Sequence, residues 1–472
     1  IAMLIFSFDK SASSKTGSLT GRVILVNDTG DPAIDQEDMS GITVALYLPS
    51  LLDSTICRIN AEHGHIGIEL NQENSFDHIW ETPWRETTTG SDGSFRFNDI
   101  KLGSYNLVAR KDGWGEVFRT GVQIAKNGQY QRNPLATEQS PYTEKHGEDN
   151  ISLYPIVDLY SNMPHEFVFK EDHVYHAGHD ITFSDRVIFE GGSIVRIGPR
   201  SNITFMSDLV CDPISKYTLF TSFTGDPNSR WNSIKVFNQN QNLSKLVLRN
   251  GETGLELHGN QSSIKNSFFD NLITGIYAHG EDIEASNLIF KDISNRGLYL
   301  DVKRAESNDI KYELHNNIFL RASIGLRTQG QPISIMHNYF IDCTKAIMSF
   351  SGFHKIERNS FDRNIDGITC IGTQIDIKDN NFFDNDNSII FLRMMYVSTS
   401  NPKIFRNNFF QNNGYAIALG TFTTMNNIDA TNNYWLYPDI EQLIYDMHDF
   451  PVLGNEVIYL PKSISRFDNA GV

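Results

Sequence analysis

The chain has 472 residues, of which 40% are apolar and 11% aromatic, and it carries a formal net charge of −17. A chain of this length can bury a large core and is expected to form two domains. The negative charge argues against nucleic acid as a partner, because such a surface cannot replace the counterions of a phosphate backbone. It also repels polyanionic glycans on average, although a local basic patch would override that repulsion.

The chain begins with an apolar run, Ile1–Phe8, followed by the polar stretch Asp9–Lys15. This order is typical of a secretory signal and a flexible tether, so we expect residues 1–16 to be a signal remnant. The protein is then secreted or held at the outer surface of a bacterial cell. A lipid anchor near this end stays open, although the junction lacks the cysteine of a lipoprotein.

Residues 17–126 show alternating apolar stretches at turn-rich spacing, which is typical of a small β-sandwich. They contain a turn, a strand and an entry to the next strand in the order Asp92-Gly93, Phe95-Arg96-Phe97 and Gly103-Ser104-Tyr105. This pattern resembles the carboxypeptidase regulatory-like domain. The resemblance implies a transthyretin-like β-sandwich, which is normally a non-catalytic module.

A long insert, Pro49–Glu86, interrupts this domain and carries His63, His65, His78, Trp80 and Trp84. Such a set could bind a metal or stack on sugar, whereas the simpler interpretation is a loop that packs over the sheet. The polar residues 127–160 contain prolines and are interpreted as a linker.

A unit of asparagine, any residue and then an aromatic or aliphatic residue recurs along the second half of the chain, starting at Asn266, Asn287, Asn317, Asn338, Asn359, Asn381, Asn408 and Asn433. A repeat of 21 residues or a little more holds three short strands, so equivalent positions of successive coils stack roughly 4.8 Å apart. We therefore predict an all-β protein in which residues 161–435 form a right-handed parallel β-helix solenoid behind the sandwich.

The repeated positions predict the interior of the solenoid. The asparagines are expected to form a ladder at a bend, because their short amides satisfy backbone groups and tolerate left-handed conformations. An inward aromatic column is expected from Phe268, Phe319, Phe340, Phe361, Phe383 and Phe410. A leucine-rich repeat is the alternative fold. Its template requires leucine at the aliphatic positions, whereas each unit here has a second β-type stretch.

Both ends of the repeat region resemble secreted, pectate-lyase-like β-helix proteins. A run punctuated by glycine precedes Trp231-Asn232-Ser233-Ile234, as in the first coils of those proteins. At the other end, Asn432-Asn433-Tyr434-Trp435 resembles the motif before a capping helix, with Leu436 where glycine is usual. Residues 436–472 are therefore predicted to be a C-terminal cap, with helical spacing over 438–446.

Polar side chains gather on one outward face of the predicted coils. With the second strand of each unit in register, four consecutive coils place seven of them within about 15 Å. We assign catalytic roles to His258, His279, Asp301 and Arg327. Substrate-binding roles fall to Glu256, Tyr277 and Tyr299. Tyrosines stack on sugars, arginine binds a carboxylate, and histidine or a carboxylate moves protons.

The alternative interpretation is a solvated polar face that arose by duplication of the repeat, and a register slip of one residue would reverse every side chain. No metal-ligating residues are assigned, and the cofactor and metal dependence stay open. The acidic cluster Asp376, Asp379, Asp384 and Asp386 offers oxygens that suit calcium, but it matches no calcium motif and bends also favour aspartate.

The expected partner is a polysaccharide or a cell-surface glycan, bound by an exported monomer. Whether the protein is an enzyme stays open. Polysaccharide lyases and glycoside hydrolases use this fold, but the fold alone does not establish an activity. The alternative is an adhesin or structural spacer without an active site.

Overall fold

The computed structural model describes residues 16–26, 38–124, 130–131, 150–163, 165–211, 216–301, 312–330, 332–350, 352–372, 374–392, 402–420, 427–453 and 455–472. The predicted signal remnant therefore lies outside the described residues up to position 15. The chain divides into two compact units. One comprises residues 1–52, 71–157 and 172–174, and the other comprises 53–70, 158–171 and 175–472.

The first unit contains two small sheets. The three-stranded sheet has the order β4 (Ser94–Lys101), β1 (Thr16–Leu25), β8 (Asn150–Leu153). The five-stranded sheet has the order β3 (Arg85–Thr88), β2 (Thr43–Tyr47), β5 (Gly103–Arg110), β6 (Glu116–Ile124), β7 (Tyr130–Gln131). Neighbouring strands are antiparallel except that β8 runs parallel to β1. Because β8 comes from residues predicted to be linker, the sheet reaches further along the chain than the sequence indicated.

Both sheets contribute to one apolar core. Val23 of β1 and Phe97 of β4 pack in the same cluster as Val44 of β2 and Leu107 of β5. The apolar positions of these strands alternate with exposed ones, which is why each sheet buries one face. The short helix α2 (Gln72–Ser75) and a 3-10 turn at His78–Trp80 belong to the same unit.

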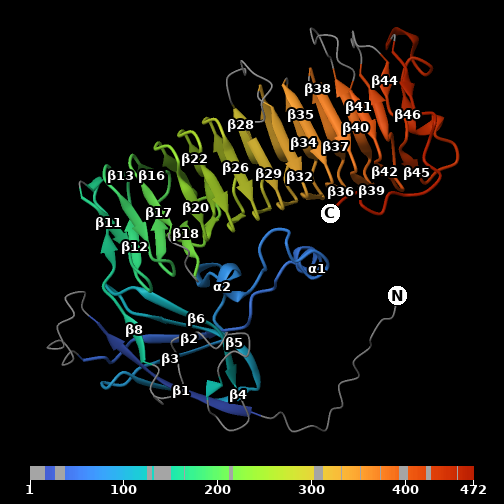
Figure 1. Ribbon diagram of the computed structural model, residues 1–472. Coiled ribbons are helices and arrows are strands. Elements are labelled where there is room, and N and C mark those ends of the chain that lie inside the picture. Colours follow the sequence, from blue (N-terminus) through green and yellow to red (C-terminus); the bar gives the residue numbers. More distant parts are fainter. Residues whose placement is uncertain are drawn as a thin grey trace, which may run out of the picture. The chain divides into compact units, whose positions relative to one another are not determined.

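The second unit is a parallel β-helix in which each coil contributes one strand to each of three 13-stranded sheets (Figure 1). Sheet A consists of β10 (Asn162–Met163), β13 (Ile181–Phe183), β16 (Asn202–Phe205), β19 (Trp231–Val236), β22 (Gly251–Leu257), β25 (Thr274–Ala278), β28 (Arg296–Asp301), β31 (Ile324–Gln329), β34 (Lys345–Phe350), β37 (Asp366–Ile371), β40 (Asn387–Leu392), β43 (Ile417–Leu419) and β46 (Ile444–Tyr445).

Sheet B consists of β11 (Phe167–Phe169), β14 (Val187–Phe189), β17 (Leu209–Cys211), β20 (Asn242–Ser244), β23 (Ser263–Lys265), β26 (Ile283–Ser286), β29 (Tyr312–His315), β32 (Ile333–Met336), β35 (Phe353–Glu357), β38 (Gln374–Lys378), β41 (Lys403–Phe405), β44 (Ile428–Asp429) and β47 (Val457–Ile458). Sheet C consists of β9 (Val157–Asp158), β12 (Val174–Ala177), β15 (Ile194–Ile197), β18 (Thr218–Ser222), β21 (Leu246–Arg249), β24 (Phe268–Asp270), β27 (Ile289–Lys291), β30 (Ile318–Leu320), β33 (Tyr339–Ile341), β36 (Ser360–Asp362), β39 (Asn381–Phe383), β42 (Asn408–Phe409) and β45 (Tyr434–Trp435).

The parallel β-helix prediction is confirmed. Among the described residues no helix lies between successive coils, so the leucine-rich repeat alternative is excluded. No described helix is both long and apolar enough for a membrane crossing.

A ladder of buried asparagines runs along one corner of the coils, through Asn317, Asn338, Asn359, Asn380, Asn407 and Asn433. From Asn338 onward, each side-chain oxygen accepts bonds of 2.8–3.1 Å from the backbone N–H and the side-chain amide of the ladder residue before it. The prediction was wrong by one residue at Asn381 and Asn408. It was also wrong at Asn266 and Asn287, whose φ values of 51° and 54° place them at the left-handed position just before the ladder.

The inward aromatic column also differs from the prediction in part. Parallel rings 4.5–5.2 Å apart form a stack of Phe269, Phe290, Phe319, Phe340, Phe361, Phe382, Phe409 and Trp435. Phe268, Phe383 and Phe410 were predicted here but occupy the neighbouring position. Because side chains alternate along a strand, each of these three points to the outer side of sheet C.

The outer face of sheet C is covered along much of its length. The segment 53–70, which includes α1 (Ser54–Glu62), packs on it although it comes from the insert of the front domain. Gly67 donates its backbone N–H to Asn316, and a Cβ on Gly67 would lie 2.8 Å from Ile318. Arg321 binds Asp53 at 2.8 Å, and Asp53 also caps α1. This segment therefore buries the apolar positions of the sheet.

The C-terminal residues cover the next coils of the same face (Figure 1). Asn381 donates to the carbonyl of Ala470 at 2.7 Å, and Asn408 both donates to and accepts from the backbone of Phe467. The predicted capping helix is wrong. Only Glu441–Leu443 and Pro451–Leu453 form 3-10 turns, while β46 and β47 continue sheets A and B beyond residue 435.

Candidate functional site

The seven predicted site residues lie together on the outer side of sheet A. Strand pairing places Glu256 beside Tyr277, Tyr277 beside Tyr299, and Tyr299 beside Arg327. Asp301 ends β28 two residues after Tyr299, and the two histidines follow the ends of β22 and β25. The predicted register of these four coils is therefore confirmed, whereas the roles of the residues stay a prediction.

Aromatic rings on this face form a continuous ladder that starts one coil earlier than predicted. Phe237 stacks on His258 at 4.3 Å, and His258 stacks on His279 at 4.7 Å. Tyr277 lies 4.0 Å from His279 and stacks on Tyr299 at 4.7 Å. Phe237 could have been found from the sequence, because it follows β19 as His258 follows β22.

The ladder changes what the tyrosines can do. One face of Tyr299 is covered by Tyr277 and the other by Arg327, whose guanidinium lies 4.8 Å from the ring centre. Tyr277 itself lies between Tyr299 and His279. Neither ring therefore offers a free face to a sugar, as the sequence interpretation required. Both can still contribute their hydroxyl edges.

The hydroxyl of Tyr277 donates to Asp301 at 2.7 Å. Burial, together with the nearby Asp301 carboxylate, raises the pKa of Tyr277 well above its usual value. Burial also raises the pKa of Tyr299. Both phenols therefore stay protonated at neutral pH and act as hydrogen-bond donors.

Two arginines flank Tyr299, and within the part of the chain that the structure describes neither forms an ion pair. The guanidinium of Arg296 lies 4.5 Å from the ring centre and that of Arg327 lies 4.8 Å from it. The Nε atom of each is buried and has no hydrogen-bond partner, and among the described residues no carboxylate forms an ion pair with either. Arg296 was missed by the sequence analysis because it starts β28, three residues before Tyr299. Unpaired guanidinium forks of this kind bind carboxylate, sulfate or phosphate groups.

His258 is a candidate proton acceptor. Its Nε2 lies 3.6 Å from Glu256, which is in turn 4.0 Å from Lys235. Burial, together with the neighbouring His279, lowers the pKa of His258, so the ring is neutral at pH 7. A neutral imidazole has one unprotonated ring nitrogen that can take up a proton, as general bases do.

The two other side-chain sets considered for metal binding form no metal site among the described residues. Among the described residues no three His, Cys, Asp or Glu side chains are placed to hold a metal ion. Asp379 of the proposed calcium cluster is bound by Arg406 at 2.7 Å, and Asp379 and Asp384 take left-handed bend positions. In the insert, buried His78 packs against Tyr47 and Phe118 and lies 3.2 Å from Glu116, which is a packing role.

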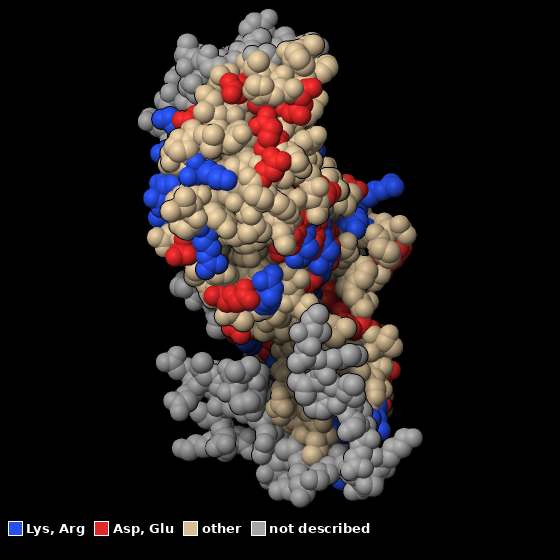
Figure 2. Space-filling view, turned by 90° about the vertical axis from the view of Figure 1, so that its right-hand side faces the viewer, with Lys and Arg blue, Asp and Glu red and all other residues tan. Residues whose placement is uncertain are grey.

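Charge is dispersed on the side of the molecule shown in Figure 2, where acidic and basic side chains are interspersed without a large field of one sign. The −17 charge of the chain therefore does not form a single acidic surface on that side. A local pair of arginines can attract an anion against such a background, because salt screens charges more than about 8 Å away.

Comparison with known proteins identifies the fold of the repeat. The family described as "Right handed beta helix region" matches residues 274–434. A search of curated proteins finds no match. Among solved structures, the A-module of mannuronan C-5 epimerase from Azotobacter vinelandii is similar at 12% identity, with a TM-score of 0.42, over 64% of this chain and 91% of that one. The tailspike protein of E. coli bacteriophage HK620, solved with a pentasaccharide, is similar at 11% identity, with a TM-score of 0.33, over 63% of this chain and 72% of that one.

Proposed function

We propose that this chain binds an acidic glycan along the outer face of β22, β25, β28 and β31. The observation that carries this proposal is the pair Arg296 and Arg327, two guanidinium groups around Tyr299 that have no ion-pair partner among the described residues. Glycans bear carboxylate or sulfate groups that match such a fork, and their hydroxyls match the tyrosine and aspartate edges beside it.

Chemistry on the bound glycan is the stronger form of this proposal. His258 is neutral and lies beside Glu256, and the Tyr277–Asp301 pair lies within the same four coils. A lyase or a hydrolase needs a proton acceptor and a proton donor on one face, and these groups supply both. The alternative from a different class is an adhesin or spacer that binds without turnover.

The remaining parts of the proposal concern the setting of the protein. The front unit has small, mostly antiparallel sheets that share one core, as a transthyretin-like domain of the carboxypeptidase regulatory type requires. The apolar N-terminal run and the polar residues after it support export to the surface of a bacterial cell. A monomer and a lipid anchor remain parts of this proposal that rest on the sequence alone.

Binding is tested by affinity electrophoresis and calorimetry with alginate, polygalacturonate, hyaluronan and, as a neutral comparison, dextran. At least one acidic polymer is expected to bind. Arg327→Ala and Arg296→Ala should each weaken that binding roughly tenfold, because a charged hydrogen bond contributes about 1.5 to 3 kcal/mol. The matched control is Arg466→Ala, which removes an exposed arginine of the C-terminal segment.

Turnover is followed on the same polymers by ultraviolet absorbance of unsaturated sugars and by release of reducing ends. Loss of turnover in His258→Ala with binding retained supports catalysis. Binding without any turnover supports the adhesin. Equal binding by the arginine variants and the parent chain would contradict the acidic-glycan proposal.

A further inference from the structure

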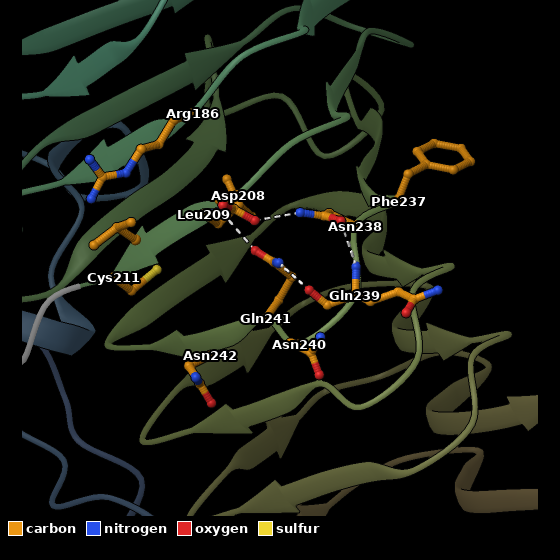
Figure 3. A pocket seen from close by; sticks show the side chains of 11 residues that line it. Arg186, Asp208, Leu209, Cys211, Phe237, Asn238, Gln239, Asn240, Gln241 and Asn242 are labelled. Atoms are coloured by element: carbon orange, nitrogen blue, oxygen red, sulfur yellow. Dashed lines mark hydrogen bonds between the residues drawn. The ribbon is translucent and has the colours of Figure 1, made fainter.

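A hollow lies on the solenoid next to the start of the ring ladder, where sheet A turns into sheet B (Figure 3). Its volume is about 930 Å³, and its walls come from three successive coils. Arg186 belongs to the first coil, Asp208 to the second, and the run from Phe237 to Asn242 to the third. None of the seven residues that the sequence singled out lines it.

Two amides of the wall hold the turn in place. Asn238 donates to Asp208 at 2.5 Å (Figure 3). Gln241 accepts the backbone N–H of Leu209 at 2.7 Å and donates to the carbonyl of Gln239 at 2.6 Å. The side chains of Gln239 and Asn240 are exposed and make no hydrogen bond to another described residue. In the wall of the hollow, the Asn238 and Gln241 side chains are therefore held by hydrogen bonds, while the Gln239 and Asn240 amides are available to a ligand.

Phe237 gives the hollow an apolar wall. One face of its ring lies parallel to His258, which belongs to the following coil. The other face must point toward the preceding coil, the one that contributes Asp208 to the hollow. Met206 is the equivalent residue of that coil, but its side chain is 49% exposed and does not line the hollow. No second aromatic ring among the described residues stacks on Phe237, which is 40% exposed.

Charge distinguishes this hollow from the arginine pair. Arg186 is bound by Glu166 at 3.2 Å and Asp208 by Asn238, so neither group is left without a partner. An anion would gain little here, whereas free amides donate to and accept from hydroxyl groups equally well. A flat apolar ring face beside such amides suits a sugar ring, which has one C–H face and a rim of hydroxyls.

We propose that the hollow beside Phe237 is a subsite for a neutral sugar, with the C–H face of the sugar on the Phe237 ring and its hydroxyls on Gln239 and Asn240. The proposal rests on the proposed function and extends it along the same glycan. Four coil spacings separate Phe237 from Arg327, which is roughly 19 Å. The ligand is then a mixed glycan whose neutral unit lies about four coils from its acidic unit.

The test titrates neutral hexasaccharides of glucose, mannose and xylose against the full chain and follows saturation-transfer NMR signals. At least one hexasaccharide should bind. Phe237→Ala and Phe237→Leu should weaken binding roughly three- to tenfold, because they remove the ring face, and Phe237→Trp should retain it. Gln239→Ala should weaken binding about fivefold. Phe450→Ala is the matched control, since Phe450 is also 40% exposed but lies in the cap.

Several outcomes overturn this proposal. It is wrong if none of the neutral sugars binds, or if Phe237→Leu binds as tightly as the parent chain, because leucine keeps the volume but not the ring. Weaker hexasaccharide binding in Phe237→Leu with unchanged binding in Phe450→Ala supports the subsite, whatever Arg327→Ala does to the binding of acidic polymers. Failure of all acidic polymers to bind contradicts the proposed function. The neutral-sugar subsite is then judged by the hexasaccharide titrations alone.

Discussion

The outer faces of sheets C and A have the same strand geometry but differ in how far other segments cover them. On sheet C, Ile289 and Ile318 are fully buried, under the segment 53–70. On sheet A, Tyr277 and Arg327 are partly exposed, and both pack against the ring of Tyr299. In this solenoid, other segments of the chain therefore cover part of one outer face, while side chains on another stay partly exposed. The difference teaches that polarity alone does not mark a site, since covered coils of sheet C are polar too.

The largest effect should come from truncation of the covered face. Ile318→Ala is expected to lower the free energy of unfolding by about 2 to 4 kcal/mol, because it leaves a cavity between sheet C and the segment 53–70. The matched change on sheet A, Ile390→Ala, removes an outward side chain that is only partly buried and should cost below about 1 kcal/mol. Urea denaturation measures both. Equal costs would show that the segment does not seal sheet C.

A second prediction concerns the interior behind sheet A. His354 is fully buried, is 2.7 Å from the hydroxyl of Thr328, and has its pKa lowered to about 4 by burial. The unfolded chain, with a histidine pKa near 6.5, takes up a proton before the folded one does. Stability from this group is therefore complete above about pH 6.5 and falls as the pH drops toward 4.

Between pH 7 and pH 4.5 this loss amounts to about 2 to 3 kcal/mol. His354→Gln keeps a hydrogen-bonding side chain but does not titrate, so its unfolding free energy should change less over that range. Denaturation curves at both pH values check this. If the parent chain and His354→Gln show the same pH dependence, the acid sensitivity comes from another group. The control variant is His448→Gln, because His448 is exposed.

The smallest change in unfolding free energy should come from Asp53, a polar residue at the edge of the covered face of sheet C. Asp53→Ala removes both the N-cap of α1 and one of the two carboxylates that bind Arg321, the other being Asp292, at an expected cost of about 1 to 2 kcal/mol. Asp53→Asn keeps the cap and loses only the ion pair, so it should cost below about 1 kcal/mol. Thermal unfolding at low and high salt separates the two. The same cost for both variants would mean that the cap contributes nothing.

The sequence predicts the architecture of the solenoid well because coil positions repeat and stack. The positions that were wrong by one at Asn381, Asn408, Phe268, Phe383 and Phe410 lie at doubled residues, whereas Asn266 and Asn287 are each followed by a different residue. Asn380 and Asn381, for example, are followed by Phe382 and Phe383, and either pair satisfies the repeat. Only the packing decides which asparagine turns inward, because a slip of one residue keeps the composition and exchanges the faces.

The candidate site was predicted in its register but not in its contacts. Spacing alone placed Tyr277, Tyr299 and Arg327 in adjacent coils, since each pair lies one coil apart. It could not show that the rings cover one another's faces, because this depends on rotamers. Arg296 was missed because it lies at a strand start, where the repeat is less regular, whereas Phe237 was missed although it follows β19 as His258 follows β22.

The docking of the segment 53–70 has a consequence for how the protein is made. Asp53 binds Arg321, 268 positions later in the chain. At a synthesis rate of about 5 to 20 residues per second, roughly 15 to 50 seconds pass before that partner leaves the ribosome. During this delay Ile56 and Ile59, which are fully buried in the finished protein, have no surface to pack against. A nascent chain of this kind is exposed to premature association, and a chaperone that shields apolar helices would shorten that exposure.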